Sequence, residues 1–239
     1  MTVYVTGDTH NDLDLQKVID WDAEISDMLT PDDYLIIAGD FGFPWDFSPK
    51  ERECVRWLES RVYTVLFVDG NHERFSYWRD RPCETWHGGQ TQRLIDGGRT
   101  RRLCRGEVFD LCGSSIFALG GASSPDRAFR RPEVSWWEDE LPTKSELKQA
   151  ETNLATHDWH VDYVITHTCA DSMLGCALYP SPNWTCPDRD RLTHFLETVE
   201  NRLAYKRWYF GHFHRDADLE RNHTVLYDEV VRLGHGVWG

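Results

Sequence analysis

Residues 34–40 read Tyr-Leu-Ile-Ile-Ala-Gly-Asp, an apolar run that ends in a glycine and a carboxylate. A short apolar run of this kind, bounded by turn residues, is typical of a β-strand. The pattern recurs further along, because the apolar stretch at 62–68 is followed directly by Asp-Gly-Asn-His. Both runs therefore predict strands that end in polar side chains.

Around these two runs, short β-rich segments alternate with amphipathic helical stretches, which indicates an α/β protein. No repeat, low-complexity segment or linker interrupts the sequence, so we expect one domain over residues 1–239. Strands are predicted at 3–6, 34–38, 62–68, 93–95, 101–104, 108–111, 115–119, 161–166, 207–210 and 224–233. Helices are predicted at 13–28 behind the possible cap Asp12, at 50–60, at 143–156 with a capping box from Thr143, and at 188–203 capped by Asp188.

The charge of the chain limits its partners. Its 239 residues include 40 acidic and 26 basic side chains, a formal net charge of −14. Proteins that hold long nucleic acids or anionic membranes gain affinity from Lys and Arg, so we expect neither partner. The first residues form no basic segment, and no apolar run is long enough to span a membrane, which predicts a cytoplasmic protein. The oligomeric state stays open.

Polar side chains follow five of the predicted strands at the point where each strand ends. Ligands of α/β sheets bind outside the carboxyl ends of the strands, so these side chains are expected to lie together. Their carboxylate, amide and imidazole groups suit Mn, Fe, Zn or Co. The donors number seven, which suits two metal ions and not one: Asp8, His10, Asp40, Asn71, His167, His212 and His214. Asp40, the lone carboxylate of its strand end, is predicted to bridge the two ions.

These residues resemble the sequence blocks of the calcineurin-like metallophosphoesterases. The family's blocks G-D-x-H, G-D, G-N-H-E, a His that ends a strand, and G-H-x-H all occur here in order, between Gly7 and His214. The resemblance implies a four-layer α-β-β-α sandwich, in which two mixed sheets pack face to face and the metal site lies at the carboxyl ends of the strands. It also implies that Asp8, His10 and His214 bind one metal, that Asn71, His167 and His212 bind the other, and that Asp40 is shared.

The same resemblance implies that His72 is not a ligand but protonates the leaving oxygen, while a hydroxide that bridges the two metals attacks phosphorus. An imidazole, with an ordinary pKa of about 6.5, is suited to that proton transfer. We therefore expect a metal-dependent phosphoesterase for a small or exposed substrate, with phosphodiesters slightly preferred, His72 and Asp40 as catalytic residues, and Mn as the most suitable assay metal. The alternatives are a phosphomonoesterase, including a protein phosphatase, and a non-catalytic metal-binding scaffold.

Further residues bear on the substrate. After Asp40 the chain continues Phe41-Gly42-Phe43-Pro44-Trp45, without the arginine that relatives resembling protein Ser/Thr phosphatases have there, and this disfavours phosphoprotein substrates. The aromatic side chains of this run either stack on a flat substrate group or pack in the core. A Gly-Gly loop at 120–130 resembles small bacterial and phage members of the family with unsettled substrates. Arg74 and Arg127 are the candidate substrate-binding residues, with Arg130 as an alternative to Arg127, and each of them is otherwise an ordinary loop or surface residue.

Overall fold

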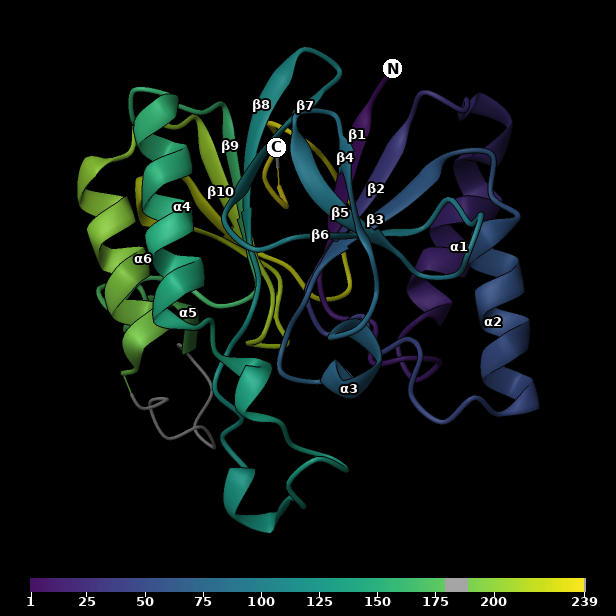
Figure 1. Ribbon diagram of the computed structural model, residues 1–239. Coiled ribbons are helices and arrows are strands. Elements are labelled where there is room, and N and C mark those ends of the chain that lie inside the picture. The colour runs from purple at the N-terminus through teal and green to yellow at the C-terminus, as the bar shows by residue number, and fades with distance from the viewer. Residues whose placement is uncertain (179–188, 239) are drawn as a thin grey trace.

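The computed structural model describes residues 1–178 and 189–238, which form two β-sheets that pack face to face (Figure 1). Both sheets are mixed, with a parallel centre and antiparallel edges. The first sheet has seven strands in the order β13 (Val231–Arg232), β1 (Val3–Thr6), β2 (Tyr34–Ala38), β3 (Thr64–Val68), β6 (Arg101–Leu103), β5 (Gly89–Arg93) and β4 (Cys83–Trp86). The second has six, in the order β11 (Ala217–Leu219), β12 (His223–Val225), β10 (Arg207–Phe210), β9 (Tyr163–Thr166), β8 (Ser114–Leu119) and β7 (Glu107–Leu111).

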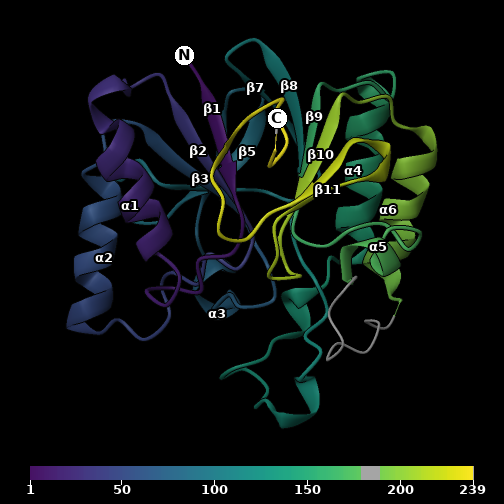
Figure 2. The same cartoon turned by 180° about the vertical axis from the view of Figure 1, so that it is seen from behind.

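Helices cover the outer face of each sheet (Figure 1, Figure 2). The first sheet is covered by α1 (Gln16–Ile25) and α2 (Pro49–Glu59), and the second by α4 (Lys144–Thr156) and α6 (Arg191–Arg202). The remaining helices are short: α3 (Phe75–Trp78), α5 (Leu174–Leu178), and the 3-10 turns η1 (Ser26–Met28), η2 (Arg127–Phe129), η3 (Glu138–Glu140) and η4 (Glu220–Asn222). This four-layer arrangement confirms the predicted α-β-β-α sandwich. None of the described helices is both long and apolar enough to cross a membrane.

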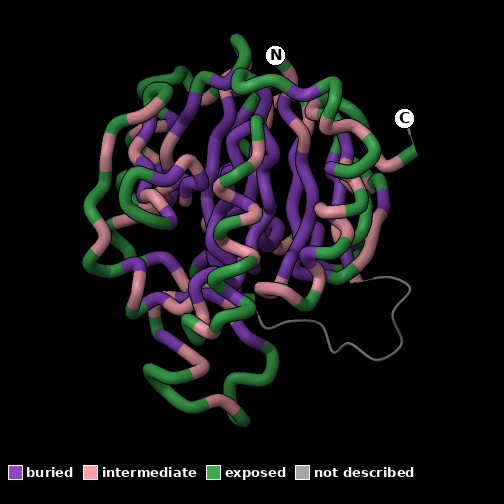
Figure 3. The backbone as a smooth tube through the Cα atoms, turned by 90° about the vertical axis from the view of Figure 1, so that its right-hand side faces the viewer, coloured by how far each residue is buried: buried purple, intermediate pink, exposed green. Residues whose placement is uncertain are grey.

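Alternating side chains of the central strands build the core on both sides of each sheet. Ile36 of β2 and Tyr209 of β10 belong to the cluster between the sheets, whereas Leu35 of β2 packs in a cluster with Leu58 of α2. The second sheet packs on its helices through Phe117, Leu154, Leu196 and Trp208, among others. Every residue of β2 and β3 is buried, and Figure 3 shows buried strands throughout the centre of the molecule. The sandwich therefore holds the strand ends in fixed positions.

Most predicted elements are present, with some differences. The helix predicted at 13–28 begins only at Gln16 with Leu15 at its N-cap position, so Asp12 does not cap it, and the Asp12 carboxylate pairs with Lys50. Asp188 lies outside the described residues, and α6 is capped by Asp190, whose carboxylate accepts a 3.0 Å hydrogen bond from the backbone N–H of Thr193. The strand predicted at 224–233 is two strands, β12 and β13, which belong to different sheets.

A buried charge cluster lies at the end of β3. The Asp69 carboxylate is fully buried, and its two oxygens lie 2.8 Å from Arg102 Nη2 and 2.8 Å from Arg105 Nε. Burial opposes its ionisation, but the two guanidinium groups outweigh burial and hold the pKa of Asp69 below its usual value. The backbone oxygen of Asp69 also accepts a 2.7 Å hydrogen bond from the N–H of Gly121. The cluster therefore ties β3 to the segment that follows β8.

Asp69→Asn is expected to lower the free energy of unfolding by about 3–5 kcal/mol, because it leaves two buried guanidinium groups without their counter-charge. Because the folded pKa is lowered, the stabilisation by Asp69 is present above its unfolded pKa of about 4 and is lost as the pH falls through the lower folded pKa. Urea unfolding at neutral pH measures the loss. Asp96→Asn is the control, because Asp96 is 95% exposed in its pair with Arg81, and should change stability by at most about 0.5 kcal/mol. Equal losses in the two variants would contradict the assignment.

Candidate metal centre

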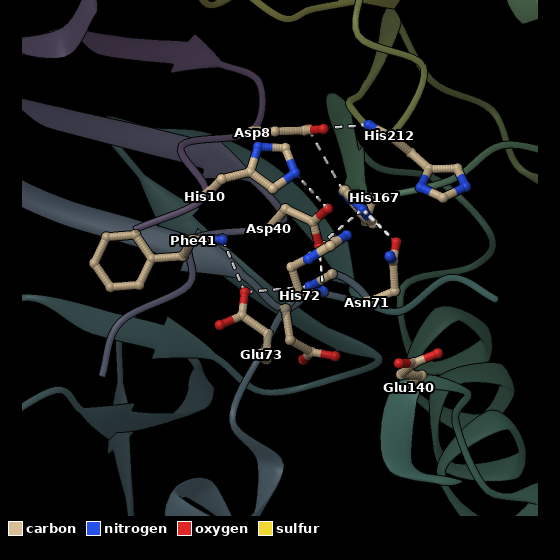
Figure 4. A network of polar contacts seen from close by, with 12 residues as sticks. Asp8, His10, Asp40, Phe41, Asn71, His72, Glu73, Glu140, His167 and His212 are labelled. Carbon is tan, nitrogen blue, oxygen red and sulfur yellow. Dashed lines mark hydrogen bonds and ion pairs between the residues drawn. The ribbon is translucent and has the colours of Figure 1, made fainter. Parts of the chain in front are cut away.

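The seven predicted ligands come from both sheets and converge at one place. Figure 4 labels six of them, all except His214. Each ligand follows the end of a parallel strand. The carboxyl ends of β1, β2 and β3 in the first sheet lie beside those of β9 and β10 in the second. Between the sheets, the backbone N–H of His212 donates a 2.9 Å hydrogen bond to Asp8 Oδ1. The fold therefore brings together donors that are more than 200 positions apart in sequence.

One group of donors surrounds Asp8. Its Oδ2 lies 3.1 Å from His214 Nε2, and the ring of His214 lies 4.9 Å from that of His10. One ligand atom from each of these three residues lies within 4.8 Å of the other two, which is close enough for a shared ion.

A second group surrounds Asp40, which is almost fully buried. Its Oδ1 lies 3.3 Å from His167 Nε2, and its Oδ2 lies 3.2 Å from His10 Nε2. His167 Nε2 also lies 3.2 Å from Asn71 Oδ1, and the His167 ring lies 5.0 Å from that of His212. The two oxygens of Asp40 therefore face different groups, as a bridging carboxylate requires.

The backbone at these positions is unusual. Four of the seven residues have a left-handed backbone, with φ of 43° at His10, 46° at Asp40, 68° at His212 and 48° at His214. Side chains with a Cβ rarely adopt this region, and such residues cluster at functional sites. The left-handed turns bend the chain sharply off each strand and direct the side chains into the centre.

Glycines before the donors provide space. A Cβ at Gly70 would overlap the Asp40 carboxylate, and a Cβ at Gly211 would overlap Asp8 Oδ1. At these two positions glycine is required by close approach of a carboxylate, which comes from the neighbouring strand end at Gly70 and from the other sheet at Gly211. The sequence shows the glycines but not what approaches them.

Two histidines are oriented by hydrogen bonds on the far side of the ring. His10 Nδ1 lies 2.7 Å from Asp14 Oδ2, and His167 Nδ1 lies 2.8 Å from the backbone oxygen of Ala38. Because Nδ1 donates to these oxygens, Nε2 of each ring is the nitrogen that faces Asp40. Asp14 was not among the predicted site residues, although it lies four positions after His10.

Glu73 is a second residue that sequence reasoning missed, although it belongs to the third block. It is fully buried and accepts hydrogen bonds from the backbone N–H groups of Phe41, at 2.8 Å, and Gly42, at 3.1 Å. Burial and the nearby Asp40 carboxylate raise its pKa to about 8. Glu73 therefore connects the end of β2 to the end of β3 without contributing a donor to the centre.

The charges of the centre favour cations. Burial opposes a charge on His10 and His167, but Asp40 and Asp8 outweigh it and raise the pKa of these rings to about 9 and about 10. Burial and the neighbouring His167 lower the pKa of His212 to about 3. The two buried carboxylates therefore attract positive charge strongly, while His212 is held as a neutral imidazole, the form that binds metals.

The donor set fits divalent metal ions. Among the residues that the structure describes, none donates a well-aligned hydrogen bond to the buried Asp8 Oδ2, although His214 Nε2 lies nearby. A buried carboxylate oxygen without a hydrogen-bond donor is stabilised by a bound cation. Imidazole, carboxylate and amide groups are the donors that Mn, Fe, Zn and Co accept.

Beside the centre lies a cavity of about 320 Å³. Its wall includes His10, Leu13, Trp45 and His72. Of the three aromatic residues predicted to stack or pack, Phe41 and Phe43 are fully buried in the core, and Trp45 alone lines this cavity. The volume is within the range of small-ligand sites.

The predicted substrate-binding arginines make other contacts. Arg74 Nη1 donates a 2.5 Å hydrogen bond to the backbone oxygen of Trp45, and the guanidinium of Arg127 lies 4.0 Å from the ring centre of Trp136. Neither of these contacts involves one of the seven donors, so both assignments stay predictions. Arg130, the alternative to Arg127, does reach the centre, with Nη2 2.7 Å from His72 Nε2.

Comparison with known proteins identifies a family. The family model described as calcineurin-like phosphoesterase matches residues 1–216. Among solved structures, a protein of unknown function, AQ665 from Aquifex aeolicus, matches at 13% identity and a TM-score of 0.39, over 85% of this chain and 87% of that one. No curated protein matches the chain.

Proposed function

The chain belongs to the calcineurin-like phosphoesterase family, and from this premise we propose that it hydrolyses a small phosphoester, with two divalent metal ions bound at the strand ends. The family and the clustered donors support a metal-dependent phosphoesterase in general. The observation that carries the proposal is the convergence of two buried carboxylates and several imidazoles on one point between the sheets.

The assignment of the ligands follows the family resemblance, and several contacts support it. Asp8, His10 and His214 would hold one ion, and these three form one of the closest donor groups. Asn71, His167 and His212 would hold the other, and Asp40 would be shared, because its oxygens face both groups. When bound, two such ions offset charge on the phosphoryl oxygens and lower the pKa of the attacking water.

His72 is the proposed proton donor to the leaving oxygen. Its backbone N–H donates a 2.7 Å hydrogen bond to Asp40 Oδ1, which fixes the residue beside the centre. Its ring lies 4.9 Å from that of His10 and lines the cavity. His72 also lies within ligand distance of His10 and Asp40, so its role as acid and not ligand rests on the family pattern and is tested below.

The cavity beside the centre has room for a substrate group other than the phosphate. A phosphodiester presents such a group on each side, and Trp45 offers a flat apolar wall for one of them. We therefore favour phosphodiesters slightly over monoesters. The net charge of −14 agrees with a small or exposed substrate in preference to a long nucleic acid.

Purified protein loaded with Mn is expected to contain two metal ions per chain and to hydrolyse bis-p-nitrophenyl phosphate faster than p-nitrophenyl phosphate. Elemental analysis and initial rates measure both. A strong preference for p-nitrophenyl phosphate would reverse the substrate order and favour a phosphomonoesterase. Two bound ions without hydrolysis of any phosphoester in a broad panel would favour the non-catalytic scaffold.

A further inference from the structure

The segment between β8 and α4 brings one guanidinium group to the candidate metal centre. This segment, residues 120–142, extends below the two sheets in Figure 1. From it Arg130 reaches back, and its Nη2 lies 2.7 Å from His72 Nε2. The Arg130 side chain is only 10% exposed, so this long cationic side chain is buried at the centre and not spread over the surface.

Two carboxylates contact the guanidinium of Arg130 through the nitrogens that do not contact His72. Its Nε lies 2.6 Å from Asp126 Oδ1, and its Nη1 lies 3.9 Å from Glu140 Oε1. Glu140 is itself buried, and its Oε2 accepts a 3.2 Å hydrogen bond from the backbone N–H of Ser124. The guanidinium is therefore fixed through Nε and Nη1, while its third nitrogen, Nη2, is directed at His72.

The segment is attached to the end of β3, which sets the position of Arg130 relative to the donors. Ser124 Oγ accepts a 3.4 Å hydrogen bond from Asn71 Nδ2. Two residues before Asn71, the Asp69 oxygen accepts from the Gly121 N–H, and Arg105 Nη2 donates a 2.6 Å hydrogen bond to the Asp139 oxygen. Both ends of the segment are thus anchored beside the centre.

The contact with His72 places a donor where substrate would lie. A guanidinium group has only donors, so His72 Nε2 accepts in this pair. A phosphoryl oxygen carries negative charge and accepts from a guanidinium more strongly than an imidazole does. An oxygen between the two side chains would take the hydrogen bond of Arg130 and leave the Nε2 lone pair of His72 free to take up a proton from water, which His72 then donates to the leaving oxygen.

We propose that Arg130 binds a non-bridging oxygen of the substrate phosphate and, in doing so, releases His72 for the leaving oxygen. This inference rests on the proposed function. Asp126 and Glu140 act as positioning residues, since they contact the guanidinium and not the centre.

Calorimetric titration of the Mn-loaded protein with inorganic phosphate tests the proposal without relying on turnover. Arg130→Ala is expected to raise the Kd for phosphate on the order of 10- to 100-fold, the effect of losing a hydrogen bond between charged groups. Arg130→Lys retains the charge and should show a smaller rise. Arg131→Ala is the matched control, because it removes the same charge from the adjacent, exposed residue, and should bind phosphate like the wild type.

Metal content is measured for every variant, so that a lost ion is not mistaken for a lost phosphate contact. An unchanged Kd in Arg130→Ala with both ions bound would overturn the proposal. If Arg130→Ala does not fold, Arg130→Lys decides, and an unchanged Kd in that variant overturns it. A wild-type protein that binds phosphate through Arg130 but hydrolyses no ester would refute the proposed function alone, whereas hydrolysis that is insensitive to Arg130 would refute this inference alone.

Discussion

Asp40→Asn is expected to lose at least one of the two metal ions and to lower kcat/KM for phosphoesters on the order of a thousandfold, as a loss of several kcal/mol of charge stabilisation implies. The carboxylate of Asp40 faces His10 with one oxygen and His167 with the other, so it is the group that both ion sites would share. Asparagine has the same shape but no charge, and one of its two terminal atoms is a donor where a metal needs an acceptor.

The fold should survive this change. The Oδ1 atom of an asparagine can still accept the 2.7 Å hydrogen bond that the backbone N–H of His72 donates to Asp40. Elemental analysis after dialysis, thermal unfolding and initial rates separate loss of metal from loss of structure. Asp96→Asn, at an exposed position, serves as the control. Full metal content together with wild-type activity in Asp40→Asn would rule out the shared-ligand assignment.

His72→Asn is expected to retain both metal ions and to lower turnover by about 10²- to 10⁴-fold on esters with poor leaving groups, the usual contribution of a general acid. An ester of p-nitrophenol leaves readily without a proton, so its hydrolysis should fall much less. The expected result is therefore a steeper dependence of rate on the pKa of the leaving group in the variant than in the wild type.

Measurement of rates on a series of aryl and alkyl phosphoesters gives that dependence, and His72→Ala provides a second variant with no polar side chain. His157→Asn is a control, because His157 is exposed at the end of α4. Loss of a metal ion in both His72 variants would indicate that His72 is a ligand, as its distance to His10 and Asp40 permits. Equal activity on a poor leaving group would remove the proton-donor role.

The sequence predicts an α/β fold and the convergence of the donors because both depend on local patterns, whereas the sandwich is what the family resemblance implies. An apolar run such as residues 34–38 needs burial on both faces, and in a parallel sheet its carboxyl end must lie beside the ends of its neighbours. Asp40 and Asn71 could therefore be placed together, because they follow parallel strands of one sheet, whereas His167 follows a strand of the other sheet. The resemblance to the family's sequence blocks predicts the sandwich, and the structure confirms that prediction.

The contacts around the donors could not be predicted, because they depend on tertiary packing. Nothing near Arg130 in sequence distinguishes it from Arg127, and only the path of the 120–142 segment directs one to His72 and the other onto Trp136. Asp12 has the character of a helix cap, but the helix begins only at Gln16, and the Asp12 carboxylate pairs with Lys50, 38 positions away (50 − 12). For a side chain with several possible partners, the fold as a whole determines which contact forms.

The division of the donors between the two sheets has a consequence for biosynthesis. Four of the seven donors, Asp8, His10, Asp40 and Asn71, follow strands of the first sheet, and three, His167, His212 and His214, follow strands of the second. The ribosome makes Asp8 first and His214 206 residues later (214 − 8). A nascent chain that has made only strands β1 to β6 of the first sheet therefore presents two carboxylates without most of their imidazole partners. The complete pair of ion sites requires that the second sheet has been translated and has docked on the first.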